Sequence, residues 1–248
     1  MNLLQGKTSI VTGANKGIGL EIVKTLARNG SNIIACSRKK YLDFESEIEN
    51  LKNSYGIDVY NIYFDLEDPV EIRNAIKSII SLKQKIDILV NNAGYAYGNM
   101  FQLTPLSEIE KAMRINFISQ IQFSQGISRI MTRNNSGSII NIGSVSGIIG
   151  DKGNLAYGAS KAALMFATKV MASELSNNKI RVNSVAPSVI RTEMLELMDE
   201  KARELLVSAS LLKKEGEVND IANMVLFLAS DLANHVNAQT IRVDGGIL

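Results

Sequence analysis

The sequence predicts an α/β fold in which about seven parallel strands form one doubly wound sheet with helices on both faces. Two observations carry this prediction. Short runs rich in β-branched residues alternate with longer stretches of helical periodicity along the 248 residues. Several of these runs are apolar throughout, which is typical of parallel strands covered on both faces. We therefore expect right-handed crossover connections, each carrying a helix.

The expected strands and helices follow one another along the chain. The strands are Thr8–Val11, Asn32–Cys36, Val59–Phe64, Ile86–Val90, Ser138–Ile142, Arg181–Val185 and Thr240–Val243. The helices are Gly17–Asn29, Leu42–Ser54, Pro69–Leu82, Leu106–Arg133, Leu155–Ser176 and Val218–Ala229. A helix therefore follows every strand except the last, as a doubly wound sheet requires.

Two of these helices begin with clear sequence signals. Asp68 and Thr104 are each followed by proline, which is favoured at the first helical position because it lacks an amide hydrogen. Glu71 and Glu108 come early in the first turn, where a negative charge interacts favourably with the helix dipole. We expect Asp68 and Thr104 to cap their helices.

Residues 1–248 are predicted to form a single domain. No internal repeat, linker or low-complexity tract interrupts the pattern, and none of the three prolines marks a boundary. Residues 188–216 differ, since they combine a helical pattern with sparse glycine and proline. We interpret this segment either as a flap that covers an apolar substrate or as a pair of amphipathic helices packed on the core. Its apolar residues are Met194, Leu195, Leu197, Met198, Leu205, Leu206, Leu211 and Leu212.

The composition argues against several classes of function. A net charge of +2 is too small to indicate binding to nucleic acid or to an anionic membrane. Cys36 is the only cysteine, so no intrachain disulfide forms, and its apolar neighbours indicate a buried strand residue. Because His235 is the only histidine and no acidic cluster has ligand spacing, we expect no metal site.

The N-terminal sequence does not resemble a secretory signal, because polar residues follow its first apolar pair, Leu3-Leu4. No stretch approaches the roughly 18 apolar residues that span a membrane. We therefore expect a cytoplasmic protein that does not bind membranes.

A glycine-spaced turn follows the first strand and opens the first helix. Its glycines, Gly13, Gly17 and Gly19, permit a tight turn and let backbone amides approach a pyrophosphate. The helix N-terminus adds partial positive charge. At this place in a strand–helix–strand unit the pattern predicts a dinucleotide site of the Rossmann type. The other residues expected to contact the cofactor here are Asn15, Lys16 and Ile18.

The end of the second strand predicts which cofactor binds. NAD-binding proteins place an acidic side chain near this point for the ribose 2′-hydroxyl, but no acid follows Arg38 before Asp43. Arg38, Lys39 and Lys40 are available instead, and Lys16 lies in the glycine turn. Because basic side chains pair with a 2′-phosphate, we predict NADP(H) rather than NAD(H). The alternative interpretation is a solvated helix entry.

Two further strand ends fall at the same edge of the predicted sheet, where open parallel sheets bind ligands. Asp65 and Leu66 follow the third strand, and Asn92, Ala93 and Gly94 follow the fourth. We expect Asp65 to accept a hydrogen bond from the adenine amino group and Gly94 to let the ribose approach. Ordinary turn chemistry is the alternative for both loops.

Ser144, Tyr157 and Lys161 form the candidate catalytic group. Tyr157 and Lys161 are four residues apart, so they share one face of a helix, and Ser144 follows the fifth strand. A tyrosine with its usual pKa near 10 exchanges protons poorly at neutral pH. We expect the Lys161 ammonium and an oxidised nicotinamide to lower the pKa of Tyr157. Ser144 is expected to hydrogen-bond the substrate oxygen as charge develops there.

In order and spacing, the chain resembles the short-chain dehydrogenase/reductase family from about Lys7 to its C-terminus. The resemblance rests on the glycine turn, Asn91-Asn92-Ala93-Gly94, Asn116, Asn141-Ile142-Gly143-Ser144, Tyr157-Gly158-Ala159-Ser160-Lys161 and Asp244-Gly245-Gly246. It implies that Tyr157 is the general acid in ketone reduction, that Ser144 polarises the carbonyl and that Lys161 binds the nicotinamide ribose.

The same resemblance implies roles for four more residues. Asn116 would hold a water that links Lys161 to solvent. Pro187, Ile190 and Thr192 would line the cofactor site, the last two at the nicotinamide carboxamide.

The chain departs from the family at two places. Pro187-Ser188 stands where relatives usually have Pro-Gly, and a left-handed backbone at Ser188 would cost about 1 kcal/mol. Asn237-Ala238 stands where relatives commonly carry Thr-Gly.

Within the family, the chain is most similar to 3-oxoacyl-(acyl-carrier-protein) reductases of fatty acid biosynthesis. The similarity lies in Asn141–Val145, in the spacing from Ser144 to Tyr157 and in Ile221–Ser230. It implies an NADPH-dependent reductase of a small-molecule or carrier-protein-bound acyl substrate, assembled as a homotetramer or dimer. Arg129 and Arg133 are candidate contacts for the carrier protein. Two alternatives stay open: a dehydrogenase of a sugar or other small alcohol, and a non-catalytic NADP-binding sensor.

Overall fold

The computed structural model describes residues 2–193, 195 and 200–247 and contains one seven-stranded parallel sheet. Its strands lie in the order β3-β2-β1-β4-β5-β6-β7. All neighbouring strands are parallel. In the register of β1 with β4, for example, Ser9 lies opposite Ile88. This confirms the predicted fold class. The strands are β1 Thr8–Thr12, β2 Asn32–Ser37, β3 Val59–Tyr63, β4 Ile88–Asn91, β5 Gly137–Ile142, β6 Ile180–Pro187 and β7 Thr240–Val243.

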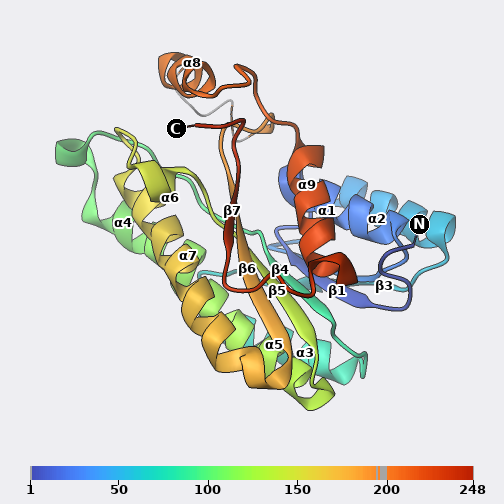
Figure 1. Ribbon diagram of the computed structural model, residues 1–248. Coiled ribbons are helices and arrows are strands. Elements are labelled where there is room, and N and C mark those ends of the chain that lie inside the picture. The colour runs from blue at the N-terminus through green and yellow to red at the C-terminus, as the bar shows by residue number, and fades with distance from the viewer. Residues whose placement is uncertain (1, 194, 196–199, 248) are drawn as a thin grey trace.

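Helices cover both faces of the sheet (Figure 1). On one face lie α1 (Gly17–Arg28), α2 (Leu42–Tyr55) and α9 (Val218–Ala229). On the other lie α3 (Pro69–Ser81), α4 (Leu106–Met113), α5 (Ser119–Asn134) and α7 (Leu155–Leu175), with the short α6 (Ser146–Ile149) leading into α7. The arrangement is doubly wound, so the carboxyl ends of all strands meet at one edge of the sheet.

The sheet divides the apolar core into two clusters. Neighbouring residues of a strand point to opposite faces, so Val11 packs beneath α1 while Ile10 packs toward α3 and α5. On the second side the rings of Phe64 and Phe123 stack with their centroids 5.2 Å apart. Cys36 is 1 % exposed, which confirms that it is a buried strand residue. Burial on both faces explains why β1 is apolar without alternation.

The helix expected over residues 106–133 is present but interrupted. A π-helical turn at Arg114–Ile118 separates α4 from α5, and the amide of Ser119 bonds the carbonyl of Arg114 instead of Ile115. No proline or glycine marks this turn in the sequence, so periodicity did not predict it. The extra residue shifts the faces of the helix on its two sides, which is common at functional sites.

One predicted helix cap is confirmed and the other is wrong by one residue. The Asp68 carboxylate accepts the amides of Val70 at 2.6 Å and Glu71 at 3.3 Å. Thr104 instead donates its hydroxyl backwards to the carbonyls of Asn99 and Met100, because it ends a 3₁₀ turn at Phe101–Leu103. Pro105 therefore takes the capping position, and α4 begins at the next residue.

Part of the segment 188–216 forms α8 (Glu200–Ala209), which stands beyond the carboxyl edge of the sheet, apart from both helix layers (Figure 1). None of the α8 side chains whose burial is described is buried, and Leu205 is 70 % exposed. This exposure does not fit the interpretation of helices packed on the core. Met194, Leu197 and Met198, which contributed to the prediction, lie outside the described residues. The segment after α8 is fixed by an antiparallel bridge between Ser210 and Ile247.

The backbone differs from expectation at the two positions that depart from the family. Ser188 has no left-handed conformation, so no strain arises there. Ala238 has φ 60, in the left-handed region that favours glycine. The strain associated with the missing glycines therefore lies just before β7.

Within the described part of the chain, every helix is too short or too polar to cross a bilayer.

Candidate active site

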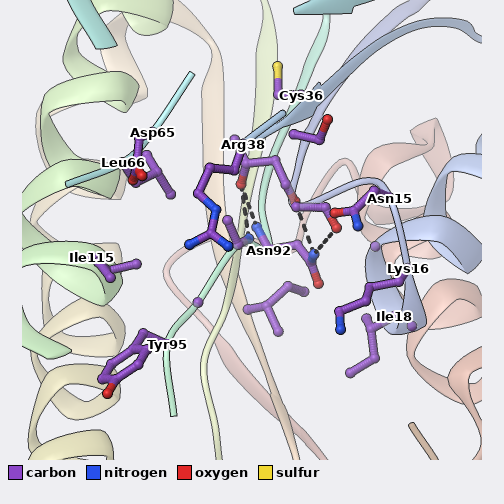
Figure 2. A pocket seen from close by; sticks show the side chains of 18 of the residues that line it. Asn15, Lys16, Ile18, Cys36, Arg38, Asp65, Leu66, Asn92, Tyr95 and Ile115 are labelled. Carbon is purple, nitrogen blue, oxygen red and sulfur yellow. Dashed lines mark hydrogen bonds between the residues drawn. The ribbon is translucent and has the colours of Figure 1, made fainter. Parts of the chain in front are cut away.

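A cleft of about 440 Å³ runs along the carboxyl ends of the strands, within the size range of small-molecule sites. It brings together most of the predicted cofactor residues, several of which Figure 2 shows facing one another. The predicted residues that line it are Gly13, Asn15, Lys16, Gly17, Ile18, Gly19, Arg38, Asp65, Leu66, Asn92, Ala93, Gly94, Tyr157, Lys161 and Thr192.

Two predicted cofactor residues do not line the cleft. Pro187 ends β6, and its carbonyl accepts the amide of Val145 at 2.9 Å. Ile190 is 6 % exposed, packs in the apolar core and pairs with Gly216 in an isolated bridge. The place of Ile190 shortly after β6 did not predict that its side chain lies in the core, whereas Thr192, two residues later, lines the cleft.

The glycine turn is packed directly against the loop after β4. A Cβ on Gly13 would lie 2.8 Å from the Cα of Ala93, and one on Gly19 would lie 2.0 Å from the carbonyl of Gly13. The Asn92 side-chain amide donates to the carbonyls of Thr12 at 2.9 Å and Gly13 at 3.2 Å, as the dashed lines in Figure 2 show. Gly13 is therefore required by contact with the loop after β4, and Gly19 by contact with the backbone of its own turn, so the turn and the loop together form one floor of the cleft.

The residues of this floor fit a nucleotide pyrophosphate. No acidic residue lies in the first turn of α1, and the capping residue Lys16 makes no side-chain bond to the helix amides. These amides are therefore available to an anion at the N-terminus of a twelve-residue helix.

Only two of the four predicted basic residues face the cleft. Arg38 lines it and makes no ion pair within the described chain. Lys40 pairs with Glu45 at 2.7 Å, and the Lys39 ammonium lies 5.4 Å from the ring centroid of Tyr41. Neither Lys39 nor Lys40 lines the cleft, although Tyr41, beneath Lys39, does. Lys16 lines the cleft but pairs with Glu193 at 2.7 Å.

The loop after β3 has the turn chemistry given as the alternative, and it also lines the cleft. The Asp65 carboxylate accepts the amide of Glu67 at 2.9 Å, which is ordinary turn chemistry. Asp65 and Leu66 nevertheless line the cleft, and the carbonyl of Leu66 accepts the hydroxyl of Ser119 at the start of α5. The turn and the cleft wall are thus the same structure.

Ser144, Tyr157 and Lys161 lie together near the end of β5. Lys161 is 3 % exposed. Its ammonium donates to the carbonyl of Ile142 at 2.7 Å and lies 5.8 Å from the ring centroid of Tyr157. Ser144 is buried, and its hydroxyl lies close enough to the Tyr157 side chain to lower the pKa of that phenol. Tyr157 and Lys161 line the cleft, and Ser144 does not.

The pKa of Tyr157 differs from the expectation. Desolvation raises the pKa of Tyr157 above its usual value, and the nearby Ser144 hydroxyl opposes this only in part. Desolvation also lowers the pKa of Lys161 to about 8. In the protein alone, burial therefore outweighs the lowering that we expected from the neighbouring ammonium.

Asn116 lies in the π-helical turn and is fully buried. Its side-chain oxygen accepts the amide of Tyr95 at 2.7 Å, and its amide donates to the carbonyl of Tyr95 and the hydroxyl of Ser160, both at 2.8 Å. A Cβ on Gly94 would lie 3.3 Å from the Asn116 oxygen and 3.4 Å from the Lys161 ammonium. Asn116 and Lys161 thus face one space, although most of the bonding capacity of Asn116 is already used.

Sequence reasoning missed a wall of the cleft formed by Tyr95, Lys111 and Glu67. Tyr95 donates its hydroxyl to Glu108 at 2.6 Å, and the Lys111 ammonium lies 4.7 Å from its ring centroid and 3.3 Å from Glu67. The bond to Glu108, with burial, raises the pKa of Tyr95 to about 12. Tyr95 directly follows Gly94, so its place beside the motif was a usable signal.

Gln120 was also missed, and no sequence signal marks it. It is fully buried, and its side-chain amide donates to the carbonyl of Ala93 at 2.8 Å. The π-helical turn directs this side chain to the loop after β4, so its role depends on an interruption that periodicity does not show.

The candidate carrier-protein contacts are not beside the cleft. Ser119, at the start of α5, reaches the cleft wall, whereas Arg129 and Arg133 lie about 15 and 21 Å further along the helix axis. Neither arginine therefore lies at the cleft. Among the described residues no group of three or more His, Cys, Asp or Glu side chains has the arrangement of a metal site.

Comparison with known proteins places the chain among oxidoreductases. The family model described as Enoyl-(Acyl carrier protein) reductase matches residues 13–248. The 3-oxoacyl-(acyl-carrier-protein) reductase of Rickettsia conorii is 38 % identical over 246 residues, covering 99 % of this chain and 98 % of that protein. The corresponding reductase of Aquifex aeolicus is 34 % identical over 244 residues, covering 98 % of each.

Solved structures share the fold over almost the whole chain. A gluconate 5-dehydrogenase from Burkholderia cenocepacia, in complex with NADP and tartrate, superposes with a TM-score of 0.92 at 28 % identity, covering 99 % of this chain and 96 % of that one. A 7α-hydroxysteroid dehydrogenase with NADH and 7-oxo glycochenodeoxycholic acid gives a TM-score of 0.92 at 30 % identity, covering 100 % and 96 %. One neighbour holds NADP and the other NADH, so similarity of fold does not decide between these cofactors.

Proposed function

Because the chain belongs to the short-chain dehydrogenase/reductase family of oxidoreductases, which use nicotinamide cofactors, we propose that it reduces a 3-oxoacyl thioester to the 3-hydroxyacyl thioester with NADPH. The observation that carries this proposal is the placement of Tyr157 and Lys161 in the wall of the cleft, with Ser144 beside Tyr157. A single catalytic domain over residues 1–248 is part of the same proposal.

Each of the three side chains has a role that follows from its environment. When bound, the reduced nicotinamide supplies the hydride. Tyr157 gives its phenolic proton to the substrate oxygen, and Ser144 hydrogen-bonds that oxygen as negative charge develops on it. The buried Lys161 ammonium, 5.8 Å from the tyrosine ring, favours the phenolate that proton transfer leaves.

The raised pKa of Tyr157 suits a general acid. Before reduction, desolvation keeps the phenol protonated at neutral pH, so the proton is present when it is needed. After transfer, the positive charges of Lys161 and of the oxidised cofactor are what stabilise the phenolate. The space shared by Lys161 and Asn116 is the route we propose for the replacement proton, with a water held there as a link to solvent.

The proposed preference for NADPH rests on the end of β2. Arg38 lines the cleft, and no acidic side chain of β2 or its following turn is there to accept the ribose 2′-hydroxyl. A guanidinium forms strong charge-assisted bonds with a phosphate. Arg38→Asp should therefore reverse the preference, measured as the Kd values of NADPH and NADH, and unchanged discrimination would contradict the assignment.

An acyl substrate is supported by exposed apolar side chains in the segment between Ser144 and Tyr157 and in and after α8. Ile148, Ile149 and Leu155 follow Ser144 and precede Tyr157 in the chain, and they are 46 %, 38 % and 41 % exposed. Leu205 and Leu211 are exposed in and just after α8, beyond the same edge of the sheet. The segment 188–216 is proposed to act as the substrate flap.

A second candidate is oxidation or reduction of a sugar or other small alcohol. It is favoured by the similarity of fold to the gluconate 5-dehydrogenase that binds NADP and tartrate. NADPH oxidation measured with acetoacetyl thioesters, sugars and small ketones separates the two candidates. Activity confined to the sugar panel would replace the first candidate by the second, and NADPH binding without any turnover would leave a sensor.

We further propose a homotetramer or dimer. The exposed Phe166 and Val170 on α7, 69 % and 42 % exposed, give this helix an apolar outer face. Light scattering of the wild type and of Phe166→Asp tests this, with dissociation expected in the variant. A monomeric wild type would contradict the proposal.

A further inference from the structure

Lys16 lines the cofactor cleft, and its ammonium forms an ion pair with the carboxylate of Glu193. Lys16 precedes α1 in the glycine turn, Glu193 follows β6, and the two charged groups are 2.7 Å apart. Both residues line the cleft, and their side chains are 63 % and 69 % exposed. The ion pair therefore joins the two walls of the cleft at its solvent side.

Glu193 is held in this position by its neighbours. A Cβ on Gly17 would lie 3.5 Å from the Thr192 methyl group, so this segment rests against the glycine turn. The Arg191 guanidinium pairs with Glu215 at 3.3 Å and with Glu217 at 2.9 Å. With Arg191 and Thr192 fixed, the Glu193 carboxylate is kept within reach of Lys16.

This arrangement bears on cofactor preference because Lys16 is one of only two basic residues that line the cleft at the glycine turn and the end of β2. Arg38 is the other, and Lys39 and Lys40 do not line the cleft. A 2′-phosphate that uses Lys16 must compete with the carboxylate that already holds it. NADH has no such phosphate, so the competition affects one cofactor and not the other.

We propose that Glu193 is a specificity-determining residue that weakens NADPH binding, and not NADH binding, by competing with the 2′-phosphate for Lys16. The inference rests on the proposed function, since it concerns the NADPH site. Exposed lysine–glutamate pairs are weak, so removing the competitor should change affinity by about two- to fivefold.

Direct binding titrations of Glu193→Gln test the proposal without reference to turnover. Nucleotide fluorescence gives the Kd of NADPH and of NADH at low salt and in 0.5 M salt, a concentration chosen to screen exposed charges. The Kd of NADPH should fall about two- to fivefold while that of NADH stays constant, and the gain should shrink in high salt. An equal gain for both nucleotides would overturn the proposal, because Lys16 would then serve the shared pyrophosphate.

Two further variants make the result specific. Glu47→Gln is the matched control, because Glu47 pairs with Lys24 of α1 at 2.9 Å outside the cleft, and its removal should leave the ratio of Kd values unchanged. In a Lys16→Met background, Glu193→Gln should have no effect on NADPH. A persistent gain there would mean direct repulsion by Glu193 and would overturn the role given to Lys16.

The two levels of proposal fail differently. A wild-type protein that does not bind NADPH contradicts the proposed function itself. If NADPH binds but the ratio of its Kd to that of NADH is the same in the wild type and in Glu193→Gln, only the role of Glu193 is contradicted.

Discussion

The ammonium of Lys161 lies 5.8 Å from the ring centroid of Tyr157, one helical turn away on α7, and is anchored to the last carbonyl of β5 at 2.7 Å. The sheet therefore fixes the position of the positive charge relative to the phenol. Because Lys161 is buried, its charge acts on the tyrosine with less screening by water than that of an exposed ammonium.

Tyr157→Phe should abolish carbonyl reduction. The substitution removes the proton donor but keeps the ring, so turnover should fall by about 10²–10⁴-fold or more while the Kd of NADPH changes little. Spectrophotometric NADPH oxidation and a binding titration measure the two effects separately. Tyr55→Phe, at the exposed end of α2, is the control for loss of a phenolic hydroxyl. Near-normal turnover in Tyr157→Phe would remove this tyrosine from the mechanism.

Gly94→Ala should weaken cofactor binding. The added Cβ would lie 3.3 Å from the Asn116 oxygen and 3.4 Å from the Lys161 ammonium, and would fill the space that these groups share. A loss of about 1.4 kcal/mol of binding free energy corresponds to a Kd for NADPH about tenfold higher.

Gly98→Ala provides the steric control for that change. Its Cβ would meet the carbonyl of Gly153 at 3.5 Å, an ordinary contact outside the cleft, and cofactor affinity should stay unchanged. Equal Kd values in the two variants would show that the space beside Lys161 is not used by the cofactor.

The buried Lys161 should make stability depend on pH. Its pKa in the folded protein is about 8, against a usual value of 10.5, so the unfolded chain binds more protons between these pH values. Stability therefore rises with pH in this window, as the cost of burying the charge disappears. In Lys161→Met this contribution is absent. The unfolding free energy of the variant relative to wild type should fall by about 2 kcal/mol from pH 7 to pH 9.5.

Urea unfolding of both proteins at the two pH values measures this difference. Lys169→Met removes an exposed lysine from the same helix and serves as the control. An equal pH dependence in the two variants would contradict a special effect of burial at Lys161.

Ala238→Gly should stabilise the protein. Ala238 has φ 60, where a Cβ costs about 1–2 kcal/mol, so glycine removes this strain. Glycine also makes the unfolded chain more flexible, which offsets about 0.4–1 kcal/mol of the gain in stability. We expect the free energy of unfolding to rise by about 0.5–1 kcal/mol. The amide of Ala238 bonds the carbonyl of Val182 at 2.9 Å, and this bond is available to glycine as well.

Chemical denaturation measures the change at Ala238. Ala167→Gly, within α7, should have the opposite sign because glycine lowers helix stability by about 1 kcal/mol. Destabilisation in both variants would mean that the conformation of Ala238 carries no strain.

Local sequence patterns were sufficient to predict the sheet and the motifs that line the cleft. Apolar runs such as Thr8–Thr12 are buried on both faces, so their composition reports directly on parallel strands. The glycine turn and the pair Tyr157 and Lys161 depend on short-range spacing along a turn or a helix face, which the sequence displays. These features were predicted because the interactions that define them span only a few residues.

The sequence by itself therefore determined the fold class, the edge of the sheet that carries the site and the residue types available there. Only the tertiary structure decided which of those residues face one another. It turned Ile190 into the core, paired Lys16 with Glu193 and brought Gln120 to the loop after β4 through an unmarked π-helical turn. It also showed that burial raises the pKa of Tyr157, because desolvation depends on surroundings assembled from distant parts of the chain, which no local pattern records.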